Sequence, residues 1–242
     1  MANLPLLDPD LANFAQEFLN LKNFNDANFW NEKNNVKLDK FKKLVKDFYI
    51  DNQHYTCVYC RQTIKVSHNG AWDLEHIVSR KENPRWTLEP FNLCIACKDC
   101  NSEKLDKEVL RKKVVKKIPH DESYYKIYHP HIDDYSKHIT VVSVGEFYLP
   151  ETKKGRETIS ICGLDRFFLK IAGVGRKTKK NSYLIRKILD VIDRSNDEEK
   201  NEKLYSIIEI LAGNSKILIK NSSQEKMQEA IVKVLKELKI TD

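Results

Sequence analysis

Two Cys-x-x-Cys pairs, and an acidic-histidine segment between them, are the residues of this chain whose types and spacing could do chemistry. The pairs are Cys57 with Cys60 and Cys97 with Cys100. Each pair has the spacing that lets a tight knuckle turn present two thiolates to one ion, and four thiolates complete a tetrahedral shell. The sequence therefore predicts a structural Zn²⁺ held by these four cysteines.

The choice of the second pair is open, because Cys94, Cys97 and Cys100 are evenly spaced. We favour Cys97 and Cys100, since Asn101 then follows the last ligand directly at the start of an expected helix. Cys94 lies in an apolar run, residues 91–96, and is interpreted as a small buried hydrophobic residue. Disulfides are the alternative for the four chosen cysteines, and we disfavour them because nothing marks the chain as secreted.

Asp73, Glu75 and His76 lie between the cysteine pairs in an apolar-polar alternation, residues 72–78, which predicts a strand with one polar face. Adjacent strand residues point to opposite faces, so Glu75 and His76 can take different roles. Hydrolysis of a phosphodiester needs a general base that activates water and a hard divalent ion that stabilises the developing charge. An imidazole and an oxygen ligand meet these needs, which favours a nuclease.

The order of these motifs resembles the HNH endonucleases of the ββα-metal type, in the subgroup whose third signature residue is asparagine. The signature residues would be His76, Asn92 and Asn101. The resemblance implies that His76 is the general base and that Asn92, in Phe-Asn-Leu, braces the loop and orients the histidine. It also implies that Glu75 and Asn101 hold a catalytic Mg²⁺ or Mn²⁺.

The same resemblance assigns two further residues. Lys104, three residues after Asn101 and on the same helical face, matches a basic position near the scissile phosphate. Asp73 is a candidate helper to the metal or to the base. Two positions depart from the commonest pattern of the family: Glu75 stands where aspartate is common, and Asn101 stands where many members carry histidine.

The resemblance implies an α+β fold, with a ββα-metal, treble-clef-like nuclease core and zinc knuckles, flanked by N- and C-terminal helical regions. We divide the chain into an N-terminal helical segment at residues 1–50, the nuclease core at residues 51–118, and crossover strands with a helical region at residues 119–242.

The apolar periodicity outside the core predicts mostly helices. Asp8 and Pro9 predict the start of a first helix, and a second follows over residues 38–48. We further expect a strand over residues 140–149, a turn at residues 153–155 and helices from residue 181 onward, the last of them over residues 227–238.

Basic residues gather in two segments that could contact a polyanion. The chain has 42 basic and 35 acidic residues and a net charge of +7, which favours a nucleic-acid partner. Each phosphate contact would add salt-dependent affinity without sequence information. An ordinary solvated helix face is the alternative. The candidate nucleic-acid-binding residues are Lys107, Arg111, Lys112, Lys113, Lys116, Arg176 and Lys177.

The remaining histidines carry weaker hypotheses. His54 and His68 flank the first cysteine pair and are interpreted as surface residues. His129, His131 and His138 lie in a segment dense in aromatic and acidic residues, which suggests a second metal site. We favour the alternative, a structured crossover packed against the nuclease core.

The function that these residues favour is metal-dependent cleavage of DNA in the cytoplasm. No apolar run reaches the roughly 18 residues of a membrane span, and no signal-peptide pattern is present. The alternatives are a free-standing restriction or homing endonuclease and a non-catalytic, zinc-stabilised nucleic-acid-binding module. An oligomer is also an open alternative.

The order of the downstream pieces gives a weaker resemblance. His-Pro, Asp-Asp-Tyr, His-Ile and Leu-Asp-Arg follow one another as in small HNH proteins encoded beside an ATPase in bacterial anti-phage defence systems of the Septu and retron-associated kind. This similarity implies an ATPase partner that licenses cleavage. The partner would be a separate polypeptide, because the chain has no Gly-x-x-x-x-Gly-Lys-Ser/Thr loop.

Overall fold

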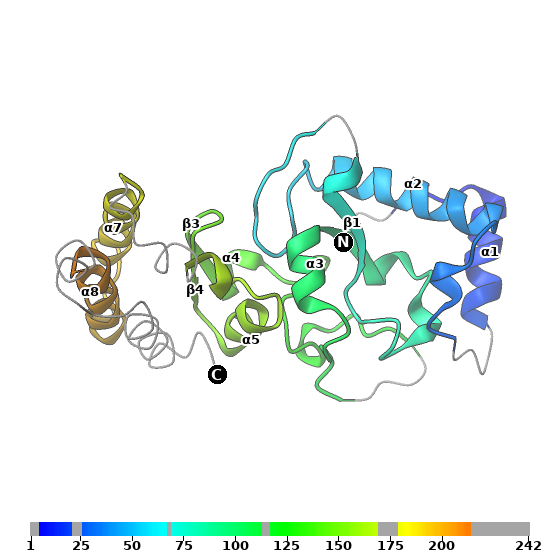
Figure 1. Cartoon of the computed structure of the whole chain (residues 1–242). Helices are drawn as coiled ribbons and strands as arrows, with labels where there is room; N and C mark the ends of the chain where they lie inside the picture. The colour runs from blue at the N-terminus through cyan, green and yellow to red at the C-terminus, as the bar shows by residue number, and fades with distance from the viewer. Residues whose placement is uncertain (1–4, 21–25, 67–68, 113–116, 169–178, 214–242) are drawn as a thin grey trace. The chain divides into compact units, whose positions relative to one another are not determined.

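Helices and two small antiparallel sheets make up the part of the chain that the structure describes, which agrees with the expected α+β class (Figure 1). The chain divides into two compact units, Met1–Tyr135 and Ser136–Asp242. The first unit holds the N-terminal helices and the segment predicted to be the nuclease core. The computed structural model describes residues 5–20, 26–66, 69–112, 117–168 and 179–213.

The first unit begins with two helices, α1 (Pro9–Asn20) and α2 (Val36–Asn52), with a short turn, η1 (Phe29–Asn31), between them. The carboxylate of Asp8 accepts a hydrogen bond from the amide of Leu11 at 2.9 Å, so α1 begins as Asp8 and Pro9 predict. The apolar stripe of α2 faces the core, which confirms the second predicted helix. Its buried residues are Leu38, Phe41, Val45, Tyr49 and Ile50.

A two-stranded sheet followed by a helix forms the centre of the first unit. β1 (Trp72–His76) pairs antiparallel with β2 (Leu93–Cys97), and Trp72 lies opposite Cys97. Every residue of β2 is buried, and α3 (Lys98–Lys104) follows it directly. The predicted strand before His76 is therefore confirmed.

The start of α3 differs from the sequence prediction. The helix begins at Lys98, not at Asn101, because Cys97 in extended conformation already ends the strand. Cys100 and Asn101 consequently lie on consecutive positions inside the same helix. The two residues therefore point to different sides of α3, Cys100 toward the cysteine cluster and Asn101 toward a cavity that His76 also lines.

The second unit contains a hairpin where the sequence predicts one strand. β3 (Ile139–Ser143) pairs antiparallel with β4 (Phe147–Pro150), and Gly145 between them has a φ of 70°. A positive φ suits glycine because it has no Cβ, and this residue allows the chain to reverse inside the predicted strand. The prediction of a single strand over residues 140–149 is thus wrong.

A helix, α5 (Lys153–Ile161), replaces the turn predicted at residues 153–155. The hydroxyl of Thr152 accepts a hydrogen bond from the amide of Gly155, which is the arrangement of a helix N-cap. A Cβ at Gly155 would lie 1.8 Å from the carbonyl oxygen of His138. The glycine therefore permits close packing, and its interpretation as a turn residue was wrong.

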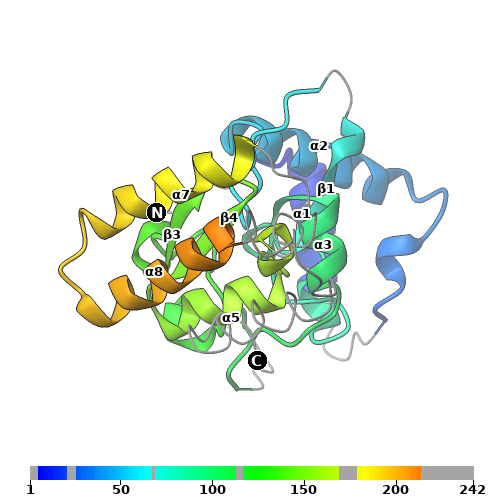
Figure 2. The ribbon, with the colours of Figure 1, turned by 60° about the vertical axis from the view of Figure 1, so that its left-hand side comes forward.

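Two further helices, α7 (Lys179–Ile192) and α8 (Glu198–Gly213), pack on each other, and α7 also packs on β3 (Figure 2). They confirm the helical pattern predicted from residue 181 as far as residue 213. The predicted helix over residues 227–238 lies outside the described residues. None of the helices in the described part of the chain is long and apolar enough to cross a membrane.

Candidate active site and cysteine cluster

Four cysteine side chains meet beside the two-stranded sheet of the first unit. The sulfur atoms of Cys57, Cys60, Cys97 and Cys100 all lie within 4.8 Å of one another, and all four residues are buried. The Sγ atoms of Cys60 and Cys97 are 3.8 Å apart. A tetrahedral Zn²⁺ with bonds of about 2.3 Å places two sulfurs roughly 3.8 Å apart. The cluster can therefore hold a zinc ion.

The backbone around the first pair forms the expected knuckle turn. Arg61 adopts a φ of 58°, and its amide donates a hydrogen bond to the carbonyl oxygen of Cys57 at 3.0 Å. Cys94 is buried in β2 outside the cluster, as expected for a small hydrophobic residue. None of the six cysteines, all of which the structure describes, forms a disulfide, which argues against the disulfide alternative.

β1 ends at His76, whose imidazole lines a cavity. Its Nε2 atom donates a hydrogen bond to the carbonyl oxygen of Thr87 at 3.0 Å, which leaves the lone pair of the neutral ring on Nδ1. Burial lowers the pKa of His76 to about 3, so the ring is neutral at neutral pH. The ring of Trp30 meets it edge-on, with centroids 4.6 Å apart. A neutral imidazole of this kind can accept a proton from water.

Asn92 fixes the loop that orients this histidine. Its Oδ1 atom accepts a hydrogen bond from the amide of Val78 at 2.8 Å. Its Nδ2 atom donates to the carbonyl oxygens of Val78 and Trp86 at 3.0 and 3.2 Å. Because Thr87 follows Trp86 directly, these bonds also hold the carbonyl group that binds His76.

Lys104 forms a buried ion pair with Glu75. The Nζ atom is 2.7 Å from Oε1 of Glu75, and the two side chains are 0% and 5% exposed. The same ammonium donates to the carbonyl oxygen of His76 at 2.9 Å. Burial raises the pKa of Glu75, and the charge of Lys104 opposes that rise. The structure thus differs from the expectation that Lys104 lies beside the scissile phosphate, because the ammonium is enclosed by protein.

Asp73 is the more accessible carboxylate of β1. Its side chain is 28% exposed, its Oδ2 atom accepts a hydrogen bond from Nδ2 of Asn101 at 2.8 Å, and its Oδ1 atom is 3.0 Å from Nζ of Lys98. Carboxylate and amide oxygens are the ligands that Mg²⁺ prefers in proteins. Asp73, Glu75 and Asn101 therefore fit a hard divalent ion by chemical type, and Asp73 offers the better access.

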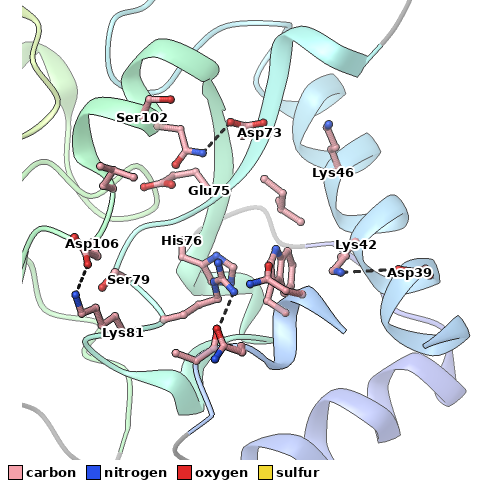
Figure 3. Close-up of a pocket in the computed structure, with 18 of the residues that line it drawn as sticks. Asp39, Lys42, Lys46, Asp73, Glu75, His76, Ser79, Lys81, Ser102 and Asp106 are labelled. Carbon is pink, nitrogen blue, oxygen red and sulfur yellow. Dashed lines mark hydrogen bonds and ion pairs between the residues drawn. The ribbon is translucent and has the colours of Figure 1, made fainter. Parts of the chain in front are cut away.

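These side chains line one cavity of about 1050 Å³ in the first unit (Figure 3). Asp73, Glu75 and His76 come from β1, and Asn101 comes from α3. The close-up shows Lys42 and Lys46 of α2 on the other side of the same space. The cavity thus combines a neutral base, oxygen ligands and cationic side chains, which are the groups that phosphodiester hydrolysis requires.

Sequence reasoning missed the contribution of Trp30, Lys42 and Lys46 to this cavity. Lys42 and Lys46 are spaced four residues apart and so share a face of α2. This spacing could have indicated from the sequence that the two lysines act together. The same helix carries further lysines: Lys37 and Lys40 lie outside the cavity, and the exposed Lys43 also lines it. The spacing alone therefore does not select the lysines of α2 that line the cavity.

The candidate nucleic-acid-binding residues fall in two groups. Lys107, Arg111 and Lys112 are exposed in the first unit, as binding to a polyanion requires. The other four lie outside the described residues: Lys113, Lys116, Arg176 and Lys177.

His129 and His131 favour packing over a second metal site. The ring of His129 stacks on Phe91 with centroids 4.8 Å apart, and Nε2 of His131 donates to the carbonyl oxygen of Leu93 at 2.7 Å. Within the described residues, no group of metal-binding side chains contains His129 or His131. His138 is 2.8 Å from the hydroxyl of Thr152 in the second unit. His54 is exposed, and His68 lies outside the described residues.

Comparison with known protein families agrees with this geometry. Residues 57–107 match the family model described as HNH endonuclease. The matched segment contains both cysteine pairs, His76, Asn92 and Asn101, so an HNH endonuclease domain is present and points to a nuclease. Neither a search of the curated proteins nor a search of the solved structures gives a match.

Proposed function

We propose that this protein is a metal-dependent endonuclease that hydrolyses phosphodiester bonds of DNA, with His76 as the general base. The observation that carries the proposal is the state of the imidazole. Nε2 is engaged by Thr87, burial keeps the ring neutral, and Nδ1 keeps its lone pair in a cavity that also contains Asp73 and Asn101. A positioned base beside oxygen ligands is the minimum that hydrolysis requires.

Each side chain has a distinct part in the proposed reaction. Nδ1 of His76 accepts the proton of the attacking water, and the carbonyl group of Thr87 stabilises the imidazolium that forms. Asn92 holds this carbonyl group in place through the loop. Asp73, Glu75 and Asn101 would hold Mg²⁺ or Mn²⁺. When bound, such an ion stabilises the negative charge that grows on the phosphate and the leaving oxygen.

The cysteine cluster has a structural role in this proposal. Its four thiolates would fill every position of a tetrahedral Zn²⁺, which leaves none for water or substrate. Cys100 and Asn101 are neighbours in α3, so the ion would hold the helix that carries one of the proposed magnesium ligands.

The proposal is tested by incubating supercoiled plasmid with the full chain and Mg²⁺ or Mn²⁺. His76→Ala should cut at least about 100-fold more slowly, since a general base contributes roughly 10² to 10⁴ to the rate. His54→Ala is the matched control, because it removes an exposed imidazole outside the cavity. Cleavage by correctly folded His76→Ala at the rate of the parent would refute the proposed role.

The same assay separates the alternatives. Discrete fragments would favour a restriction or homing endonuclease, whereas broad degradation or nicking fits a weakly specific effector. Binding that is unchanged in His76→Ala, with no product under any metal, would favour a zinc-stabilised binding module.

We further propose that the nuclease acts in the cytoplasm as the effector of a bacterial anti-phage defence system with an ATPase partner. The order of the downstream motifs supports this proposal. These motifs extend over both units of the chain: the His-Pro motif, His129 with Pro130, belongs to the first unit, and the Leu-Asp-Arg motif, residues 164–166, belongs to the second. Plasmid cleavage should rise when a candidate ATPase and ATP are added. An unchanged rate together with failure of the two proteins to co-purify would contradict the proposal.

A further inference from the structure

The wall of the cavity opposite the catalytic residues is formed by α2. Lys42 and Lys46 lie one helical turn apart on the same face of this helix, both are half-buried, and both line the cavity. Figure 3 shows the two side chains projecting from α2 on the side of the cavity that faces Asp73 and His76. The adjoining apolar face of α2, which includes Phe41 and Val45, packs into the core, so the helix presents these lysines from a fixed support.

Lys42 is held close to the proposed general base. Its Nζ atom lies 5.0 Å from the ring centroid of Trp30, and Trp30 in turn meets the ring of His76. The nearest carboxylate, that of Asp39, is 3.9 Å away and 62% exposed. An ion pair at that distance and exposure neutralises little of the charge, so Lys42 can still bind an anion in the cavity.

Lys46 lies on the side of the cavity that contains Asp73. Burial lowers the pKa of Lys42 and of Lys46, and the charge of Asp73 opposes this change at Lys46. Both ammonium groups have therefore lost part of their water without leaving the cavity. A phosphate that enters would replace this lost solvation.

We propose that Lys42 and Lys46 bind backbone phosphates of duplex DNA and hold one strand across the cavity against Asp73 and His76. This inference rests on the proposed function and assigns to α2 the contact with the substrate backbone. A polyanion that approaches carboxylates needs cations on the facing wall, and ammonium groups meet this need at any sequence. Different elements of the first unit then bind the DNA and carry out the chemistry. α2 binds the strand, and β1 and α3 carry the residues that cut it.

The test measures the affinity of a fluorescein-labelled DNA duplex by anisotropy over a range of salt concentrations. All variants carry His76→Ala, so that the probe stays intact. The slope of log K against log salt should fall by about 0.9 for Lys42→Gln or Lys46→Gln and by about 1.8 for the double variant. Each single loss should weaken binding roughly tenfold at 0.1 M salt.

Lys37→Gln is the matched control. It removes the same charge from the same helix, but Lys37 lies outside the cavity and pairs with Asp10 at 3.1 Å. Its salt slope should stay close to that of His76→Ala alone. Lys42→Arg and Lys46→Arg, which keep the charge, should largely restore binding. Thermal melting checks that every variant is folded.

Two results would overturn the inference: variants of Lys42 and Lys46 that bind like Lys37→Gln, or a folded His76→Ala protein that binds no duplex even at low salt. Failure of the proposed function gives a different pattern. A parent protein that leaves plasmid intact, while Lys42→Gln and Lys46→Gln still lose salt-dependent binding, would support the contact with DNA and refute the hydrolysis.

Discussion

Lys104 and Glu75 form an ion pair of 2.7 Å in which both side chains are almost completely buried. The pair joins the last residue of α3 to β1, and Lys104 also donates a hydrogen bond to the backbone carbonyl oxygen of His76. One ammonium group therefore fixes the helix that carries Asn101 against the strand that carries the proposed base.

Breaking this pair from one side should be costly. Lys104→Met leaves the charge of Glu75 buried and unpaired, so we expect a loss of about 3–5 kcal/mol in the free energy of unfolding, measured with urea. Lys104→Met combined with Glu75→Gln should lose clearly less than the sum of the single changes. Lys81→Met is the control, because its pair with Asp106 is exposed and should matter little. If the double variant lost as much free energy of unfolding as the two single variants together, the two side chains would not stabilise the fold as a pair.

Loss of one cysteine ligand should release zinc and unfold the first unit. Structural zinc contributes on the order of 10–16 kcal/mol in small zinc-stabilised folds, which exceeds the stability of an ordinary domain. We expect Cys57→Ser to purify with little zinc and to lose its cooperative melting transition. Cys94→Ala should keep a full equivalent of zinc, because Cys94 is buried away from the cluster. Equal metal contents, measured by mass spectrometry, would show that the four-cysteine assignment is wrong.

Asn92→Ala should reduce the rate of cleavage more than it reduces binding of the substrate. The change removes three buried hydrogen bonds to the loop, so Thr87 would no longer hold His76 in one orientation. We expect kcat to fall at least about tenfold while KM changes little, together with a loss of about 2–3 kcal/mol in stability. A rise in KM with kcat unchanged would place Asn92 in substrate binding instead.

The stability of the first unit should decrease in mild acid, and His131 contributes to this decrease together with His76. Burial lowers the pKa of His131 below its ordinary value of 6.5, whereas the unfolded chain binds the proton at that value. The unfolded state thus takes up more protons below pH 6.5, and the free energy of unfolding falls as the pH drops. His131→Gln keeps a donor for Leu93 and should reduce this pH dependence, while the part that arises from His76 remains. The test compares urea unfolding at pH 7.5 and pH 5, with His54→Gln as the exposed control.

Local patterns explain why much of the site could be predicted from the sequence. Cys-x-x-Cys spacing depends on a single turn, and the alternation around His76 depends on one strand, so both are visible in a short stretch of residues. The start of α1 at Asp8 and the apolar stripe of α2 are local for the same reason.

The remaining features depend on contacts between distant segments. The burial of Lys104 requires α3 to pack on β1, and the role of Gly155 depends on the backbone of His138. No local pattern distinguishes Lys42 and Lys46 from the other lysines of α2, because only the packing of that helix decides which of them face the cavity.

The proposed chemical groups, the ion pair and the second cysteine pair all lie within residues 73–104. Contacts within so short a stretch have low contact order, so this part can form early in folding without long loops to close. α2, by contrast, comes from a separate stretch of the sequence. Substitutions in α2 can then change how tightly nucleic acid is held while the segment with the proposed chemical groups stays intact, so affinity for the substrate and chemistry can evolve independently.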